Sequence, residues 1–78
     1  MIPLDEFHTV VVESLKVIRK TDTITLGVND SFADFGLDSL DSMSLILELE
    51  KRLPIEFDEE FELFDHDSVS KLYAFLQN

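Results

Sequence analysis

Apolar side chains recur at steps of three and four residues along the first part of the chain, which is the spacing of one face of an α-helix. The stripe consists of Leu4, Phe7, Val11, Leu15 and Ile18. Pro3 suits the first turn of a helix, and three basic residues suit the negative end of its dipole: Lys16, Arg19 and Lys20. The spacing therefore predicts a helix over residues 4–18 that buries one face against other elements.

A second helix is predicted from Ser39 to about Leu53. Asp38 is a good N-cap for it, because the carboxylate can accept hydrogen bonds from the first free backbone N–H groups. Pro54 disfavours a helical conformation in the residue before it, so the helix should end there.

Two shorter helical pieces are expected in the last third of the chain. A short acidic turn over residues 58–64 should face inward through two aromatic side chains, Phe61 and Phe64. The last helix should run from Ser68 to about Gln77, with Asp67 or Ser68 as its cap. Its apolar residues to bury are Val69, Leu72, Phe75 and Leu76.

The stretch over residues 21–38 contains both glycines and several turn-forming residues. Ile24, Leu26 and Val28 alternate as in a strand, but a lone strand has no partner for its backbone. We therefore expect a long extended loop that positions something and is anchored by Ile24, Leu26, Phe32, Phe35 and Leu37. The expected fold is all-α: a small four-helix bundle with three main helices, one short helix and a long first loop, forming one domain over residues 1–78.

The chain is strongly acidic. Six Lys and Arg residues against seventeen Asp and Glu residues give a formal net charge of −11. A field of this sign repels phosphate backbones, so nucleic acid is not an expected partner. Basic patches on other proteins are the expected targets, and the same charge also serves to keep a small protein soluble.

Cysteine is absent from the sequence, which excludes a disulfide framework, a thiolate metal site and a cysteine nucleophile. Any thiol chemistry must then come from an attached group. The N-terminus lacks the pattern of a signal peptide, and apolar runs such as residues 10–12 are too short to span a bilayer. We expect a cytoplasmic location.

The second predicted helix has two apolar stripes. The first packs into the core and consists of Leu45, Ile46, Leu49 and Leu53. The other consists of Leu40, Met43 and Leu47, with Ser44 and Glu50 beside it. The long loop could cover this second stripe, or its residues could be scattered exposed apolar residues of the kind common on soluble proteins. A Met and two Leu in line on an acidic surface favour a partner-binding face.

No catalytic set is present. A serine nucleophile needs a base within hydrogen-bond reach, and nothing in the sequence places His8 or His66 next to Ser39. No acidic run has the glycine and glutamate spacing of a calcium loop. We predict neither an enzyme nor a dedicated metal site, and leave open loose binding of divalent ions by the acidic surface.

The run from Asp34 to Met43 resembles the attachment site of acyl carrier proteins, whose signature is Gly-x-Asp-Ser-Leu at a loop-to-helix junction. The matching residues are Gly36, Leu37, Asp38, Ser39 and Leu40. The order of helices and the acidity are also similar over nearly the whole chain. A short match alone is weak, but a match at the expected place in a chain of this length and charge is strong.

The resemblance implies that a phosphopantetheinyl transferase, with coenzyme A and Mg²⁺, attaches a 4'-phosphopantetheine arm to Ser39. The thiol of the arm would then carry acyl or aminoacyl groups as thioesters. A helix N-terminus favours a phosphate, whereas Asp38 and Asp41 should repel it and hold the arm away from the surface. Taken without its context, a Ser after Asp at a helix start is usually a capping residue.

The resemblance also implies partners: a loading enzyme (an adenylation enzyme or an acyltransferase) and downstream synthases or transferases. We expect them to be basic and to meet a monomeric carrier. The surface that they contact should contain Asp38, Leu40, Asp41, Met43, Leu47 and Glu50.

Three functional hypotheses remain. Ser44 stands where housekeeping fatty-acid carriers usually have Glu, and Lys51 and Arg52 replace a further acid. This departure favours a specialised carrier of a polyketide, nonribosomal peptide or aminoacyl-transfer pathway. The alternatives are a housekeeping fatty-acid carrier and an unmodified acidic interaction module with the carrier fold.

Overall fold

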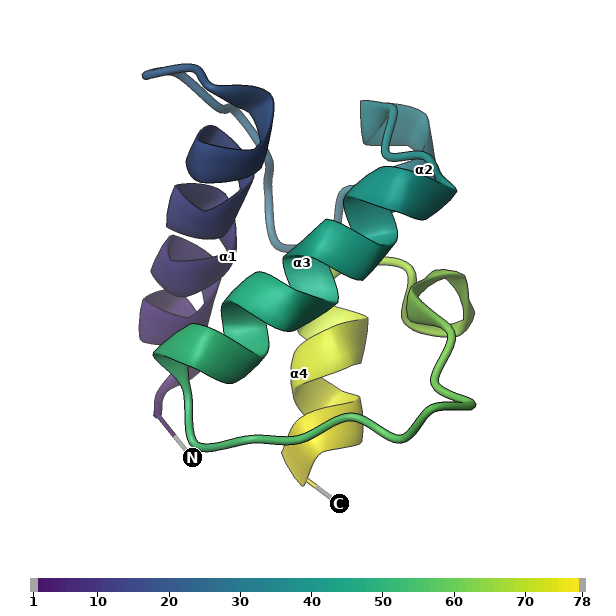
Figure 1. Cartoon of the computed structure of the whole chain (residues 1–78). Helices are drawn as coiled ribbons and strands as arrows, with labels where there is room; N and C mark the ends of the chain where they lie inside the picture. The colour runs from purple at the N-terminus through teal and green to yellow at the C-terminus, as the bar shows by residue number, and fades with distance from the viewer. Residues whose placement is uncertain (1, 78) are drawn as a thin grey trace.

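The apolar stripe at the start of the chain forms helix α1, Leu4–Arg19, in the computed structural model, which describes residues 2–77 (Figure 1). Phe7, Val11 and Leu15 are fully buried, so the predicted helix and its inward face are confirmed. Lys20 ends the helix in the left-handed conformation, and its N–H donates to the carbonyls of Lys16 and Val17. Residues 1 and 78, the ends of the predicted domain, lie outside the described residues.

Helix α3, Ser39–Arg52, crosses in front of α1 in Figure 1, and α4, Val69–Gln77, packs against α1 as well. Ser68 caps α4, because its hydroxyl accepts a hydrogen bond from the N–H of Lys71 at 3.1 Å. No strand is present in residues 2–77. The predicted all-α fold is confirmed.

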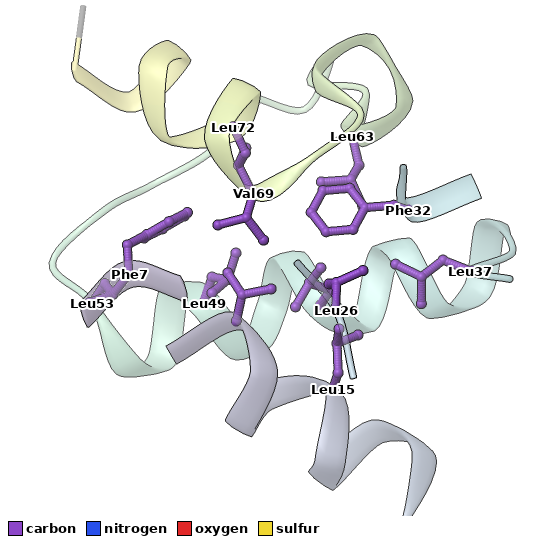
Figure 2. Packing of buried hydrophobic residues seen from close by; sticks show 12 residues of the cluster. Phe7, Leu15, Leu26, Phe32, Leu37, Leu49, Leu53, Leu63, Val69 and Leu72 are labelled. Carbon is purple, nitrogen blue, oxygen red and sulfur yellow. The ribbon is translucent and has the colours of Figure 1, made fainter. Parts of the chain in front are cut away.

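The core lies between α1, α3 and α4. Its labelled side chains point into the space that these helices enclose (Figure 2). From α3, Leu45 and Leu49 are fully buried and Leu53 at its end is buried, as predicted, whereas Ile46 is only partly buried. Burial of a side chain of this size stabilises the folded state by about 1.5–3 kcal/mol relative to leaving it exposed. These contacts hold α3 in a fixed orientation.

The expectation of an extended loop over residues 21–38 is only partly right, because the loop contains a short helix, α2, Phe32–Phe35. Ser31 caps α2 by accepting the N–H of Asp34, and Gly36 ends it with a φ of 106°. The anchors act as predicted: Leu26, Phe32 and Leu37 are buried, and Ile24 and Phe35 pack partly buried against the core. Local capping therefore stabilises one helical turn inside the loop.

The loop also forms hydrogen bonds with residues at the start of α4. The hydroxyl of Ser31 donates to the carboxylate of Asp67, and the N–H of Ala33 donates to the same carboxylate at 3.2 Å. The N–H of Ser70 donates to the carbonyl of Val28 at 2.8 Å. Asp67 is thus engaged with the loop, and Ser68 is left to cap α4.

The predicted helical turn over residues 58–64 is only partly right. A single turn does form there, because the N–H of Phe61 donates to the carbonyl of Asp58 at 3.0 Å, but the helical residues lie later, in a 3-10 helix, η1, at Leu63–His66. Leu63 is 1% exposed, whereas Phe64 is 37% exposed and does not face inward. Phe61 precedes η1 and is partly buried. A turn that starts five residues later brings a different side chain to the core.

The expectation that Phe75 of α4 is buried is also wrong, since its side chain is 41% exposed. Its ring contacts Phe61 and His66, with centroids 5.2 Å and 4.3 Å away, instead of entering the core. The other predicted residues agree better: Val69 and Leu72 are fully buried and Leu76 is partly buried. Since η1 packs against α4, the rings of His66 and Phe61 lie on the side of α4 that carries Phe75.

Candidate functional site

Ser39 is the first residue of α3 and is exposed. Within residues 2–77 its hydroxyl makes no hydrogen bond, while its carbonyl accepts one from the hydroxyl of Ser42 at 2.9 Å. Asp38 is extended, and its carboxylate accepts the N–H of Asp41 at 2.8 Å, so the predicted N-cap is confirmed. The cap is on Asp38 and leaves the Ser39 hydroxyl free to face solvent.

The residues before Ser39 determine where it lies. Gly36 has a positive φ, and an added Cβ there would meet its nearest atom, Arg19 Nη2, only at 3.9 Å. Backbone conformation, not space, therefore requires glycine. Leu37 is buried and its N–H donates to the carbonyl of Phe32. The turn at Gly36 and the anchor at Leu37 together place the start of α3 at the surface.

Arg19 connects the end of α1 to this junction. Its Nη2 donates to the carbonyl of Gly36 at 2.9 Å and lies 3.3 Å from the carboxylate of Asp41. The guanidinium also lies over the ring of Phe35, 5.2 Å from the centroid. Sequence reasoning placed Arg19 only at the helix end and missed this contact, for which the sequence contains no signal.

The charge around Ser39 is thereby less negative than the sequence alone suggests. Asp41 is paired with Arg19, and the carboxylate of Asp38 receives a backbone N–H. The N-terminal N–H groups of α3 add partial positive charge. The repulsion that we expected between these two acids and a phosphate is reduced by these partners.

The second apolar stripe of α3 is open to solvent. Leu40 is 71%, Met43 62% and Leu47 61% exposed, so the long loop does not cover them. Glu50, expected beside this stripe as a partner contact, is partly buried, and its carboxylate accepts the N–H of Phe57 at 2.8 Å. It is therefore also engaged with the chain's own backbone.

The other serines of α3 are less accessible. Ser42 is buried, and Ser44 is intermediate in exposure. The histidines are engaged elsewhere: Nε2 of His8 lies 2.5 Å from the carbonyl of Leu26, and His66 is stacked on Phe61.

Residues 2–77 contain no group of three His, Cys, Asp or Glu side chains arranged to hold a metal ion. In the same residues, no helix has the length and apolar character needed to cross a membrane.

Two comparisons identify similar proteins. A family model described as phosphopantetheine attachment site matches residues 5–76. Bacitracin synthase 1 of Bacillus licheniformis is 35% identical over 78 residues, which is 100% of this chain but 1% of that protein. No solved structure shows a significant match.

Proposed function

The chain belongs to the phosphopantetheine attachment site family, and on that premise we propose that its arm is attached to Ser39. Members of this family carry 4'-phosphopantetheine covalently and are carriers without catalytic activity of their own. The chain is thus a carrier protein.

The exposed position of Ser39 at the first turn of α3 is the observation that carries the assignment. In the transfer, Ser39 Oγ forms a phosphodiester with the phosphopantetheine part of coenzyme A. Its proton passes to a base of the transferase, and the nucleotide part of coenzyme A leaves. The free N–H groups at the start of α3 favour the phosphate, and the arm supplies the thiol that the chain lacks.

The partner surface in this proposal is the exposed stripe Leu40, Met43 and Leu47 with the acids Asp38, Asp41 and Glu50. The acids increase the association rate with a basic enzyme, and the apolar side chains increase the lifetime of the complex. The transferase, a loading enzyme and downstream synthases would use this surface in turn. We place the carrier in the cytoplasm as a monomeric domain over residues 1–78.

A specialised pathway is favoured over fatty-acid synthesis. The similar protein is by its name a synthase of bacitracin, although this chain spans only 1% of its length. Ser44, Lys51 and Arg52 also make α3 less acidic than the resemblance to fatty-acid carriers implies. An aminoacyl cargo loaded by an adenylation enzyme fits these observations best.

The attachment is tested by mass spectrometry of the intact protein after incubation with coenzyme A, Mg²⁺ and a broad-specificity transferase. Wild type and the control Ser42→Ala should each gain the mass of one phosphopantetheine arm, and Ser39→Ala should gain none. A gain in Ser39→Ala would overturn the assignment. No gain in wild type would favour the unmodified interaction module.

The pathway is tested with the arm-bearing protein. Adenylation enzymes supplied with ATP and a panel of amino acids should load it, and the mass of the ejected arm identifies the cargo. Efficient loading by fatty-acid synthesis enzymes, without loading by any adenylation enzyme, would contradict the specialised role.

A further inference from the structure

A pocket of about 250 Å³ opens between the acidic segment before η1, η1 itself and α4. Four aromatic rings line it: Phe57, Phe61, His66 and Phe75. Phe57 and Phe61 lie 4.6 Å apart between centroids, and the rings of Phe61 and His66 are nearly parallel at 5.5 Å. We call this site the aromatic pocket. Its rings pack on one another and are not sealed in the core, since Phe75 is exposed and the other three are partly exposed.

Five carboxylates share the lining of the aromatic pocket: Glu56, Asp58, Glu60, Glu62 and Asp65. All five side chains are exposed. None of them takes part in an ion pair within residues 2–77, where the ion pairs instead use Glu13, Asp41 and Glu48. No Lys or Arg belongs to the described lining. The pocket therefore combines π faces with uncompensated negative charge.

We propose that the aromatic pocket receives an arginine side chain of a partner protein. A guanidinium is planar, stacks on aromatic rings and donates paired hydrogen bonds to carboxylates, so it satisfies both features of the lining. A lysine ammonium is a more strongly hydrated point charge and uses the rings less well. A purely apolar partner would leave the surrounding carboxylates without compensation.

The chain already holds one of its own guanidinium groups in this way. Arg19 lies over the ring of Phe35 and pairs with the carboxylate of Asp41. The aromatic pocket offers the same two kinds of contact, and no Lys or Arg among residues 2–77 lines it. This internal example supports arginine as the occupant.

The position of the pocket fits a protein that also covers α3. Asp58 and Phe61 line both the aromatic pocket and a neighbouring groove formed with Met43, Ile46 and Leu47. A partner seated on the exposed stripe of α3 can thus extend an arginine into the pocket. This choice of partner rests on the proposed function, but occupation of the pocket requires no arm on Ser39.

The test uses NMR titration of the full chain carrying Ser39→Ala, so that no arm is present. The probes are acetylated, amidated tetrapeptides of arginine, lysine or citrulline, in low-salt buffer. Citrulline keeps the shape of arginine without its charge. The arginine peptide should shift the ring resonances of Phe75 and His66 and bind several-fold more tightly than the lysine peptide. The citrulline peptide should show no saturable binding.

Matched variants distinguish binding in the aromatic pocket from general attraction of the peptide to an acidic surface. Glu60→Gln with Glu62→Gln should weaken the arginine peptide about tenfold, and Phe75→Leu should weaken it several-fold while keeping an apolar side chain. The control removes two acids that do not line the pocket, Glu13→Gln with Asp22→Asn, and should change affinity less than twofold. If Phe75→Leu unfolds, the glutamine pair still decides the matter.

Equal weakening by the control pair, or peptide-induced shifts confined to residues outside the pocket, would overturn the proposal. Equal binding of the citrulline peptide would overturn it too. These outcomes are independent of arm attachment, because the protein in the titration cannot carry the arm and the mass test on wild type decides attachment separately.

Discussion

Arg19, the last residue of α1, lies 3.3 Å from the carboxylate of Asp41 in the first turn of α3. The same guanidinium donates to the carbonyl of Gly36, three residues before Ser39. One side chain thus connects the first helix, the end of the loop and the start of the helix that begins at Ser39. Its loss should loosen that junction.

Replacing Arg19 with Gln should lower the free energy of unfolding by about 1–2 kcal/mol. The ion pair is partly exposed and contributes about 0.2–1 kcal/mol, and the hydrogen bond and the ring contact add similar amounts. In a domain of this size each 1 kcal/mol corresponds to about 4–8 °C in melting temperature. Thermal unfolding followed by circular dichroism measures the change.

The matched control is Lys51→Gln, which removes a charge whose side chain is 77% exposed and forms an ion pair with Glu48. Its effect should stay below about 0.5 kcal/mol. Arg19→Lys should not restore full stability, because an ammonium lacks the planar donor pair. Similar melting temperatures for Arg19→Gln and Lys51→Gln would show that the junction does not depend on Arg19.

Replacing Asp38 with Ala should cost about 1 kcal/mol, because the N–H of Asp41 loses its capping acceptor. Asn is a comparable cap, so Asp38→Asn should retain most of the stability. Urea unfolding of the three proteins measures the difference. Equal losses for Asn and Ala would mean that the charge of Asp38, and not its cap, stabilises α3.

Two leucines of α3 should differ strongly in how much their replacement lowers stability. Leu49 is fully buried, so Leu49→Ala should cost about 2–5 kcal/mol, whereas Leu47→Ala at an exposed position should change stability by less than about 0.5 kcal/mol. Leu47→Arg should keep the fold, as measured by circular dichroism, and reduce loading by partner enzymes. Unfolding of Leu47→Arg would place that residue in the core.

Salt should stabilise the protein, since seventeen acids share a small surface with six basic residues. Raising the ionic strength from about 0.01 M to about 0.15 M shortens the Debye length from about 30 Å to about 8 Å and screens their repulsion. Screening also weakens pairs such as Arg19 with Asp41, but the acids far outnumber these pairs. The melting temperature should therefore rise, and Glu60→Lys should show a smaller rise than wild type. A melting temperature that does not change with salt would contradict this account.

The helical framework could be predicted from local patterns. The stripe of α1, the cap at Asp38 and the end of α3 before Pro54 each depend on residues within a few positions of one another. The serine and its flanking residues were also recognisable, because their order along the chain is itself the signature. Local capping could have revealed α2, because Ser31 precedes and Gly36 follows this short segment. The alternation of apolar residues just before it, over residues 24–28, favoured an extended loop instead.

The errors concern side chains whose surroundings come from distant segments. Phe64 and Phe75 are as apolar as the buried Phe7 and Phe32, so composition could not separate them. Their exposure follows from where η1 begins and how it meets α4. The aromatic pocket arises in the same way, from rings that lie before η1, within it and after it along the chain.

The sequence by itself determined the helices, their inward faces and a serine at the head of the second long helix, because helix periodicity and capping act between near neighbours. Only the tertiary structure decided which basic residue contacts the segment on either side of that serine and which of the described carboxylates form ion pairs. Those relationships join residues such as Arg19 and Asp41, whose separation in space depends on how two helices pack and not on their spacing along the chain.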